Sequence, residues 1–572
     1  MKTGYFLLLF AFLILSAFAQ QNEVDLDSII NRYQNHRDYE LKDYPLGKYD
    51  AEVPKQRAAF ARKLLDQLDQ VDLDELSETE VISYELLRFV LQDALDEYRF
   101  KMYLNPIQAD QGFHLDLNYR IRPLRSFRQA ENYLETLKAI PYFVESNIGL
   151  MRKGLEEGIS QPQIIFNGYE SSYNIHIVDS AEASAFYQPF IDLPENISQQ
   201  RKDSLKKAAQ KVITDSVIPS FKKIKQFFET EYLPKTRTEI GVSAQPGGSE
   251  FYQNRINYYT TSKDYTAKSI HELGLNEVAR ITAEMENIIE EVGFDGSFLD
   301  FLKFLRTDEQ FYAKTGDELL MHARDMAKRI DNELPAFFGK LPRQPYGVIP
   351  VPAAIAPKYT GGRYSGSNIN GTEAGHYLVN TYKLDSRPLY TLPALTAHEA
   401  VPGHHLQGAL NQEMGDSIPS FRRNLYLSAY GEGWGLYSEY LVDEMGIYRT
   451  PYEKFGQLTY EMWRACRLVV DTGIHAFGWS RQEVVDFMSE NTALSIHEIS
   501  TETDRYIGWP GQALSYKIGE LKIRELRQRA KIALGEKFNI REFHQVILEQ
   551  GTVTLPILEK QVDAWIAESK EE

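Results

Sequence analysis

The sequence VDLDELSETEVISYELLRFVLQDALDEY, residues 71–98, is representative of most of this chain. Its apolar residues recur at intervals of three and four positions, as at Leu86, Leu87, Val90 and Leu91. This spacing places them on one face of an α-helix, where they can be buried together. The stretch therefore predicts an amphipathic helix.

Helical periodicity continues along the chain. In residues 204–232 we expect a break at Pro219, because proline lacks the amide hydrogen that a helix interior uses. Further helices are predicted over residues 263–292, 315–338, 421–445, 452–477, 481–490, 515–534 and 556–569. The sequence thus predicts a mainly α protein, a large multi-helix fold.

Residues 346–381 depart from this pattern, because glycine, proline and β-forming residues are mixed there. Residues 346–352 and 376–381 indicate two short strands around a glycine-rich turn at Gly361-Gly362. We expect these strands to form a small antiparallel sheet near the active site.

The glycine-rich residues 241–248 are the most plausible internal boundary. They separate a predicted N-terminal helical region, residues 20–240, from a second region, residues 241–572, that contains the candidate functional residues. We expect the two regions to pack as one body with a cleft.

The N-terminus has the features of a signal peptide. Lys2 precedes an apolar run over residues 5–18, and Ala17-Phe18-Ala19 matches the small-x-small pattern of a cleavage site. A retained membrane anchor is the alternative, but 14 apolar residues give a helix of about 21 Å against a hydrocarbon core of about 30 Å. We expect residues 1–19 to be removed and the protein to be periplasmic or secreted, without stable membrane association.

Composition narrows the possible partners. The 572 residues are 43% hydrophobic and 25% charged, which is typical of a globular protein, and the net charge of −18 argues against nucleic acid or an anionic membrane as partner. Cys466 is the single cysteine and lies outside the signal, so the sequence offers neither an intrachain disulfide nor a lipid attachment site after the signal.

The segment His398-Glu399-Ala-Val-Pro402-Gly403-His404-His405 begins like a zinc motif. In His-Glu-x-x-His, histidines one helical turn apart bind one metal, and the glutamate acts on water. Here the next histidines come six and seven positions after His398. Glu272 also follows a histidine, His271, but no second histidine is near, so we interpret that pair as structural.

A straight helix would not bring these histidines to one metal. His404 would lie about 240° around the axis from His398, and His405 would lie on the same face but about 10.5 Å further along. Pro402 and Gly403 allow the helix to widen or kink, which would return His404 toward His398. The alternative is a helix end with a Pro-Gly turn and two surface histidines.

A zinc peptidase needs a third protein ligand and leaves one position for water. Glu432 is the candidate, within Ala429-Tyr-Gly-Glu-Gly-Trp-Gly-Leu-Tyr-Ser-Glu439. Three glycines in a helical pattern cost stability and are tolerated where another group approaches the backbone closely. Glu439, two turns further along the same face, is too distant for the same metal but is able to orient one of its ligands.

These motifs resemble those of a bacterial family, domain of unknown function 885, with the pattern His-Glu-x-x-Pro-Gly-His followed by Glu-Gly-Trp-x-Leu-Tyr. They stand here at residues 398–404 and 432–437. The resemblance also covers residues 470–475, 505–506 and 510–519. It implies a helical, cleft-type metallopeptidase-like fold with one Zn²⁺ per chain, bound by His398, His404 and Glu432, with Glu399 as base. His405 then orients a ligand or packs beside the site.

Related helical peptidases stabilise the oxyanion with a tyrosine and a histidine, and Tyr516 and His475 are the candidates implied here. Arg505 or Lys517 is the candidate for binding a substrate carboxylate by a charge-assisted hydrogen bond. The predicted strand over residues 376–381, which contains Asn380, is a candidate for pairing with an extended substrate backbone.

We therefore expect an exported zinc-dependent peptidase that hydrolyses short peptides, with an exopeptidase such as a carboxypeptidase or dipeptidase favoured. One alternative is a zinc hydrolase of a small non-peptide amide. Another is an inactive metal-binding or peptide-binding relative. An uncoordinated Glu399 argues against a purely structural zinc site, which four ligands would close. The direction of attack, the side-chain preference, the oligomeric state and the choice between periplasm and secretion stay open. The choice between His404 and His405 as the second histidine ligand also stays open, although the resemblance favours His404.

Overall fold

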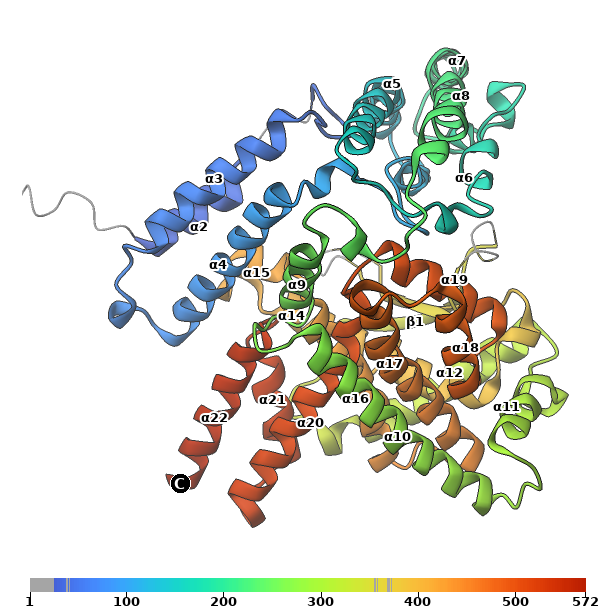
Figure 1. Cartoon of the computed structure of the whole chain (residues 1–572). Helices are drawn as coiled ribbons and strands as arrows, with labels where there is room; N and C mark the ends of the chain where they lie inside the picture. Colours follow the sequence, from blue (N-terminus) through green and yellow to red (C-terminus); the bar gives the residue numbers. More distant parts are fainter. Residues whose placement is uncertain are drawn as a thin grey trace, which may run out of the picture.

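The computed structural model describes residues 25–571 except 38–39, 41, 354–355, 357–358, 368–370 and 372. The predicted signal peptide, residues 1–19, lies outside the described residues. The described chain is mainly helical with one small three-stranded sheet, which confirms the predicted fold class (Figure 1). In the described part, no helix combines the length and the apolar character that crossing a membrane requires.

Three helices begin the described chain: α2 (Leu26–Asn35), α3 (Glu52–Leu68) and α4 (Glu78–Arg99). Helix α4 begins seven residues later than the periodicity predicts. Ser77 caps it, because its hydroxyl accepts from the amide of Glu80 while the Glu80 carboxylate accepts from the amide of Ser77. The apolar residues Leu87 and Leu91 of α4 then pack against α2 and α3.

Helices α5 (Phe127–Glu156), α6 (Ser171–Asn174), α7 (Gln199–Val212) and α8 (Ile218–Phe227) gather at one end of the molecule (Figure 1). The predicted break at Pro219 is wrong. A π-helical turn over Ile213–Val217 joins α7 to α8, and Pro219 lies in the first turn of α8, where a missing amide hydrogen costs little.

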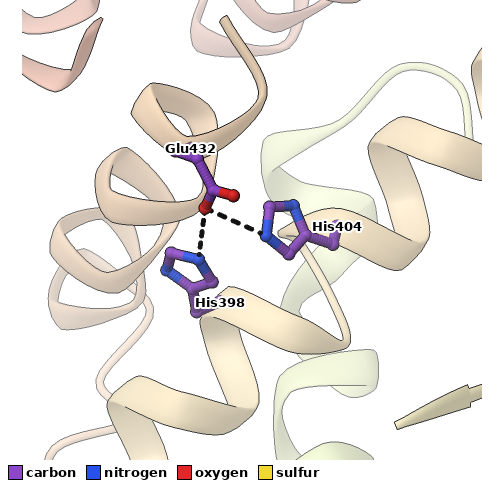
Figure 2. Close-up of side chains that lie close together, drawn as sticks. All are labelled: His398, His404 and Glu432. Carbon is purple, nitrogen blue, oxygen red and sulfur yellow. Dashed lines mark hydrogen bonds and ion pairs between the residues drawn. The ribbon is translucent and has the colours of Figure 1, made fainter. Parts of the chain in front are cut away.

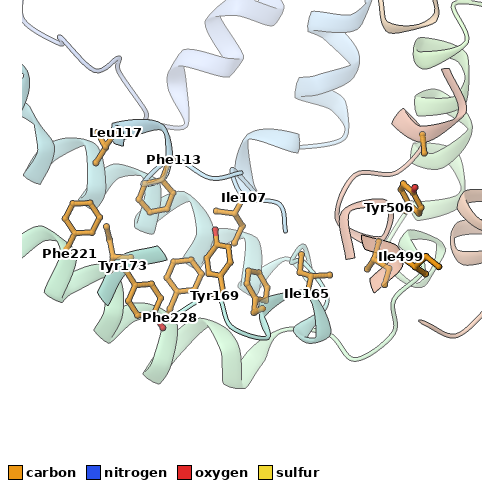
Figure 3. Close-up of a cluster of buried hydrophobic side chains, with 14 of the residues drawn as sticks. Ile107, Phe113, Leu117, Ile165, Tyr169, Tyr173, Phe221, Phe228, Ile499 and Tyr506 are labelled. Atoms are coloured by element: carbon orange, nitrogen blue, oxygen red, sulfur yellow. The ribbon is translucent and has the colours of Figure 1, made fainter. Parts of the chain in front are cut away.

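A cluster of aromatic and aliphatic side chains fills the interior of this end (Figure 3). Phe113, Tyr169 and Phe228 pack together there, and the same cluster continues to Ile499 and Tyr506, far along the chain. Residues from both predicted regions therefore share one hydrophobic core.

In the rest of the chain, the predicted helical segments form helices with closely similar bounds. Residues 421–445 are the exception, because they form two helices. The helices over Gly248–Tyr259, Phe298–Thr307, Ile496–Gly508 and Ile540–Leu548 were not predicted. The helices are α9 (Gly248–Tyr259), α10 (Ala267–Glu291), α11 (Phe298–Thr307), α12 (Gly316–Phe337), α13 (Leu392–Glu399), α14 (His404–Glu413), α15 (Ser420–Asn424), α16 (Ser428–Glu444), α17 (Pro451–Phe477), α18 (Arg481–Asn491), α19 (Ile496–Gly508), α20 (Ser515–Leu534), α21 (Ile540–Leu548) and α22 (Leu555–Glu571).

The sheet contains β1 (Tyr346–Pro350), β2 (Gly362–Ser365) and β3 (Gly375–Val379) in the order β1-β3-β2. The predicted antiparallel pairing is wrong for the two predicted strands, because β1 and β3 are parallel. The predicted glycine turn forms β2, which pairs antiparallel with β3. The long connection between β1 and β3 permits a parallel crossover, so β3 is central and β2 is an edge strand.

Helices α16 and α20 approach so closely that their backbones touch. A methyl group added at Gly433 would lie 2.6 Å from the Cα of Gly519, and one added at Gly519 would lie 1.9 Å from the carbonyl oxygen of Ala429. Only glycine fits at either position without moving a helix.

Replacing Gly433 by alanine should therefore reduce the free energy of unfolding, by about 1–3 kcal/mol for a clash that the backbone must relieve. Gly149 is the matched control, because it is an exposed residue of helix α5 and an added methyl group meets no atom within 4 Å. Gly149→Ala should stabilise the protein by roughly 0.5–1 kcal/mol. Urea denaturation measures both changes, and equal effects of the two substitutions would contradict the close contact.

Candidate metal centre

The histidine segment forms two short helices joined by a tight turn. Helix α13 ends at Glu399 and α14 begins at His404, so the helix is interrupted rather than widened. In the turn, the amide of Gly403 donates to the carbonyl of Ala397 at 2.9 Å. A methyl group on Gly403 would lie 2.0 Å from the carbonyl oxygen of His398, so this turn requires glycine.

The interruption brings His404 back beside His398. Their rings are 4.7 Å apart between centroids and nearly perpendicular, at 89°. The Nε2 atom of each lies 3.3 Å from Oε2 of Glu432 (Figure 2). The ligand atoms of all three residues lie within 4.8 Å of one another. The structure therefore brings together the three residues predicted as metal ligands.

The glycines of α16 allow Glu432 to reach this position. A methyl group on Gly435 would lie 2.6 Å from the His398 ring, and one on Gly431 would lie 2.5 Å from the Tyr426 ring. The indole of Trp434 donates to the carbonyl of Pro402 at 2.8 Å. Helix α16 thus holds the turn between the two histidines as well as supplying the carboxylate.

Carboxylates give the site a strong preference for positive charge. Burial opposes protonation of His398, but hydrogen bonds to Glu432 and Glu439 outweigh it and raise the pKa of His398 to about 9. Burial likewise acts to raise the pKa of Glu432, yet His404 and His398 hold it well below its usual range. A cation at this point is therefore stabilised by buried anionic groups.

Glu439 lies behind His398, as predicted from its position two turns along α16. Its Oε1 is 2.7 Å from Nδ1 of His398 and 3.5 Å from the guanidinium of Arg464, and its side chain is fully buried. A carboxylate in this position fixes the ring orientation and leaves Nε2 directed toward Glu432.

The donor set suits zinc. Two imidazole nitrogens and one carboxylate oxygen are ligands that Zn²⁺ prefers, and bond lengths of about 2.0–2.2 Å in a tetrahedron place ligand atoms roughly 3.3 Å apart. Both nitrogen-to-oxygen distances to Glu432 have this value. Among the residues that the structure describes, this is the one group of three or more possible ligands that meets the spacing of a metal site.

Glu399 lies next to this set without belonging to it. Its carboxylate accepts a hydrogen bond from the backbone amide of Tyr364 on β2 at 2.7 Å. His405, in contrast, points away: Nδ1 is 3.1 Å from the hydroxyl of Tyr364, and Nε2 is 3.0 Å from the carbonyl of Gln344. His404 is therefore the histidine of the pair that faces Glu432.

The expected role of His475 as an oxyanion donor is wrong. Its ring is fully buried. Nδ1 accepts from the amide of Val242 at 3.1 Å, and Nε2 donates to the carbonyl of Tyr506 at 3.0 Å. With burial lowering its pKa to about 3, His475 is a neutral core residue that links two chain segments.

Lys517 is not available to a substrate carboxylate. Its side chain is completely buried, and its Nζ lies 2.8 Å from Glu461, 2.9 Å from Glu520 and 3.0 Å from Glu277. These carboxylates come from α17, α20 and α10, so the lysine holds three helices together. The periodicity of α20 predicts a helix but not which of its charged residues face inward.

Asn380 is also structural. Its amide donates to the carbonyls of Ala356, Tyr359 and Thr360, and its oxygen accepts from the amide of Tyr382. Strand β3 is paired on both edges, so it has no free edge for a substrate. The edge strands are β1 and β2, and the Tyr364 amide on the outer edge of β2 faces Glu399.

Tyr516 lies close to Tyr426, whose hydroxyl bonds Glu432, and Arg505 lies close to Tyr516. The guanidinium of Arg467 lies 4.5 Å from the Tyr516 ring centre, and Tyr516 is half-buried. Arg505 is held by Glu502 at 3.4 Å and by Gln512 at 2.9 Å, with its side chain 14% exposed. Their predicted roles stay predictions.

Tyr426 is a site residue that the sequence analysis missed. Its hydroxyl donates to Oε1 of Glu432 at 2.7 Å. Its side chain is 54% exposed, but its hydroxyl lies against Glu432. Desolvation of the hydroxyl there, together with Glu432 and Tyr516, raises its pKa above the usual range, so it stays a hydrogen-bond donor. It precedes α16 and lies over Gly431, which is the one local signal that a ring packs there.

Comparisons with known proteins place this chain in a family. The sequence profile described as "Bacterial protein of unknown function (DUF885)" matches residues 33–562. The chain belongs to the DUF885 family. A comparison with curated proteins gives no match.

Two solved structures share this DUF885 fold. A crystal structure from Colwellia psychrerythraea, described as a "putative lipoprotein", has a TM-score of 0.85 and 29% identity over 91% of this chain and 92% of that chain. A structure from Shewanella oneidensis, described as a "putative lipoprotein of unknown function", has a TM-score of 0.67 and 17% identity over 94% of this chain and 96% of that one. The second likeness is one of fold alone.

Lys517→Met should destabilise the protein by about 3–5 kcal/mol, because it leaves buried carboxylates without their partner. Lys531→Met, on the exposed face of the same helix, should change the free energy of unfolding by less than about 0.5 kcal/mol. Denaturant titration compares the two variants. A loss as small as that of the control would mean that Lys517 is not the centre of the buried charge network.

Proposed function

We propose that this protein is an exported, zinc-dependent peptidase that hydrolyses short peptides. The observation that carries the proposal is the carboxylate of Glu399 beside, but outside, the set of His398, His404 and Glu432. A site of three ligands with an uncoordinated carboxylate next to it has the composition of a hydrolytic zinc site rather than a structural one.

The three ligand residues would hold zinc, which when bound acts as a Lewis acid toward water and toward a carbonyl oxygen. Glu399 accepts the proton of the attacking water and transfers it to the leaving amine. The amide of Tyr364 donates to one Glu399 oxygen, which fixes the carboxylate and leaves its other oxygen for the water.

Two tyrosines supply hydrogen-bond donors where negative charge develops on the substrate oxygen. Tyr516 is the first, because its hydroxyl forms no hydrogen bond among the described residues and its ring is fixed against Arg467. Tyr426 is the second, although its hydroxyl also orients Glu432. Both are proposed roles.

The edge strand β2 favours a peptide over a small non-peptide amide. Its outer edge passes Glu399, so an extended peptide that adds to this edge would lie with a carbonyl group near the base. Arg505, partly exposed beyond Tyr516, is the proposed partner of a terminal carboxylate, which favours an exopeptidase.

We further propose that the protein acts outside the cytoplasm. The proposal rests on the N-terminal residues 1–19 and on the description of two relatives of similar fold as lipoproteins. Cys466 is not a lipid attachment site here, because it is buried inside α17.

Metal analysis tests the ligand set. The purified wild-type protein should contain about one zinc per chain, and His404→Asn and Glu432→Gln should each lose it, because three protein ligands are the minimum for a catalytic site. His405→Asn is the matched control and should keep the metal, since its ring faces Gln344 and Tyr364. Retention of zinc by Glu432→Gln would contradict the assignment.

Glu399→Gln should keep the zinc but lower kcat for short peptides at least 100-fold, because a general base contributes about 10²–10⁴. Glu272→Gln is the matched control, since the pair His271-Glu272 on α10 has the same residues and its histidine bonds Thr472. Hydrolysis of a mixed peptide library, read by mass spectrometry, measures both variants. No cleavage by the wild type would rule out the peptidase, and cleavage of amides alone would favour the non-peptide alternative.

A further inference from the structure

A cavity of about 210 Å³ lies outside the metal centre. It is bounded by the end of β3, the start of α13, helix α17 and the first turn of α19, and none of its lining residues is a proposed metal ligand or Glu399. One buried water requires roughly 10–15 Å³, so the cavity is large enough for a small organic molecule.

Two opposite charges line this cavity without pairing. Arg387 and Glu498 both line it, yet neither forms an ion pair in the part of the chain that the structure describes. The Nε of Arg387 is buried without a hydrogen-bond partner. The carboxylate of Glu498 accepts no hydrogen bond among the described residues. Burial raises its pKa, although the more distant charges of Arg387, Arg464 and Arg467 oppose this.

A second arginine that lines the cavity, unlike Arg387, has hydrogen-bond partners within the protein. Arg306 also lines it, but its guanidinium donates to the backbone carbonyls of Ser489, Thr492 and Leu494. Asp385, a further lining residue, is exposed and therefore hydrated. Arg387 and Glu498, both partly buried, are thus the charged lining residues without a protein partner.

The remaining walls are largely apolar. Leu319, Val379, Leu392 and Leu395 contribute aliphatic side chains, and Leu494 closes the wall beside α19. A ligand complementary to this lining carries a carboxylate for Arg387, an ammonium group for Glu498 and an apolar substituent between them.

We infer that this cavity is a binding site for a free α-amino acid with an apolar side chain. The ligand is neutral overall, so it supplies a partner to each of the two unpaired, partly buried charges without adding net charge. The site requires neither zinc nor Glu399, so the inference goes beyond the proposed peptidase activity and does not depend on it.

Isothermal titration of the wild-type protein with L-leucine, N-acetyl-L-leucine and L-leucinamide tests this inference. L-leucine should bind with one site per chain. The acetylated compound lacks the ammonium group and the amide lacks the carboxylate, so each should bind at least about tenfold more weakly, as expected for a lost charged hydrogen bond.

Variants then assign the two charges. Glu498→Gln should abolish the preference for leucine over N-acetyl-leucine, and Arg387→Gln should abolish the preference for leucine over leucinamide. Glu490→Gln and Lys303→Gln are matched controls, because they remove exposed charges outside the cavity lining, and they should bind all three compounds as the wild type does. Circular dichroism identifies any variant that fails to fold, and the comparison of ligands on the wild type does not depend on the variants.

Glu432→Gln separates this site from the metal centre. If leucine binds to Glu432→Gln as it binds to the wild type, the cavity site stands, whatever the outcome for peptide hydrolysis. If binding is lost with Glu432, leucine was bound at the metal centre and the inference is overturned. Absence of leucine binding, or equal binding of the three compounds by the wild type, would overturn it as well.

Discussion

The site depends on the close approach of helix α16 to its neighbours. Glycines make this approach possible, because they leave no side chain between the elements. Gly435 lies under the ring of His398, Gly431 lies under Tyr426, and Gly433 meets Gly519 of α20. Side chains at these positions would push α16 outward, and Glu432 would then be too distant from both histidines. The instability that glycine brings to a helix is offset by the close packing that it allows.

The turn between α13 and α14 also depends on close contacts of glycine and on helix α16. Gly403 fits against the carbonyl of His398, and the indole of Trp434 holds the carbonyl of Pro402. One helix therefore supplies Glu432, fixes the turn that returns His404, and carries Glu439 behind His398. Because these contacts share one rigid element, the three ligand residues are positioned relative to one another before any metal binds.

Charges are buried around the site in two distinct ways. Lys517 is surrounded by carboxylates of three helices, and Glu439 lies between His398 and Arg464, so each of these charges has partners. Arg387 and Glu498 line a cavity without partners. The first arrangement organises helices, whereas the second is one that a ligand can complete.

Periodicity alone predicted long helices such as α10, α17 and α20, because apolar residues at intervals of three and four positions share one helix face. It did not predict α3 or α5. Local chemistry also indicated His398, Glu399 and Glu432, whereas the family resemblance favoured His404 over His405. Tertiary structure decided the rest. The sheet is mixed because pairing depends on a crossover that no single strand encodes, and His475, Lys517 and Asn380 are structural because their partners lie far away in the sequence. Tyr426 and the cavity at Arg387 and Glu498 were not predictable either, since each exists only where distant segments meet.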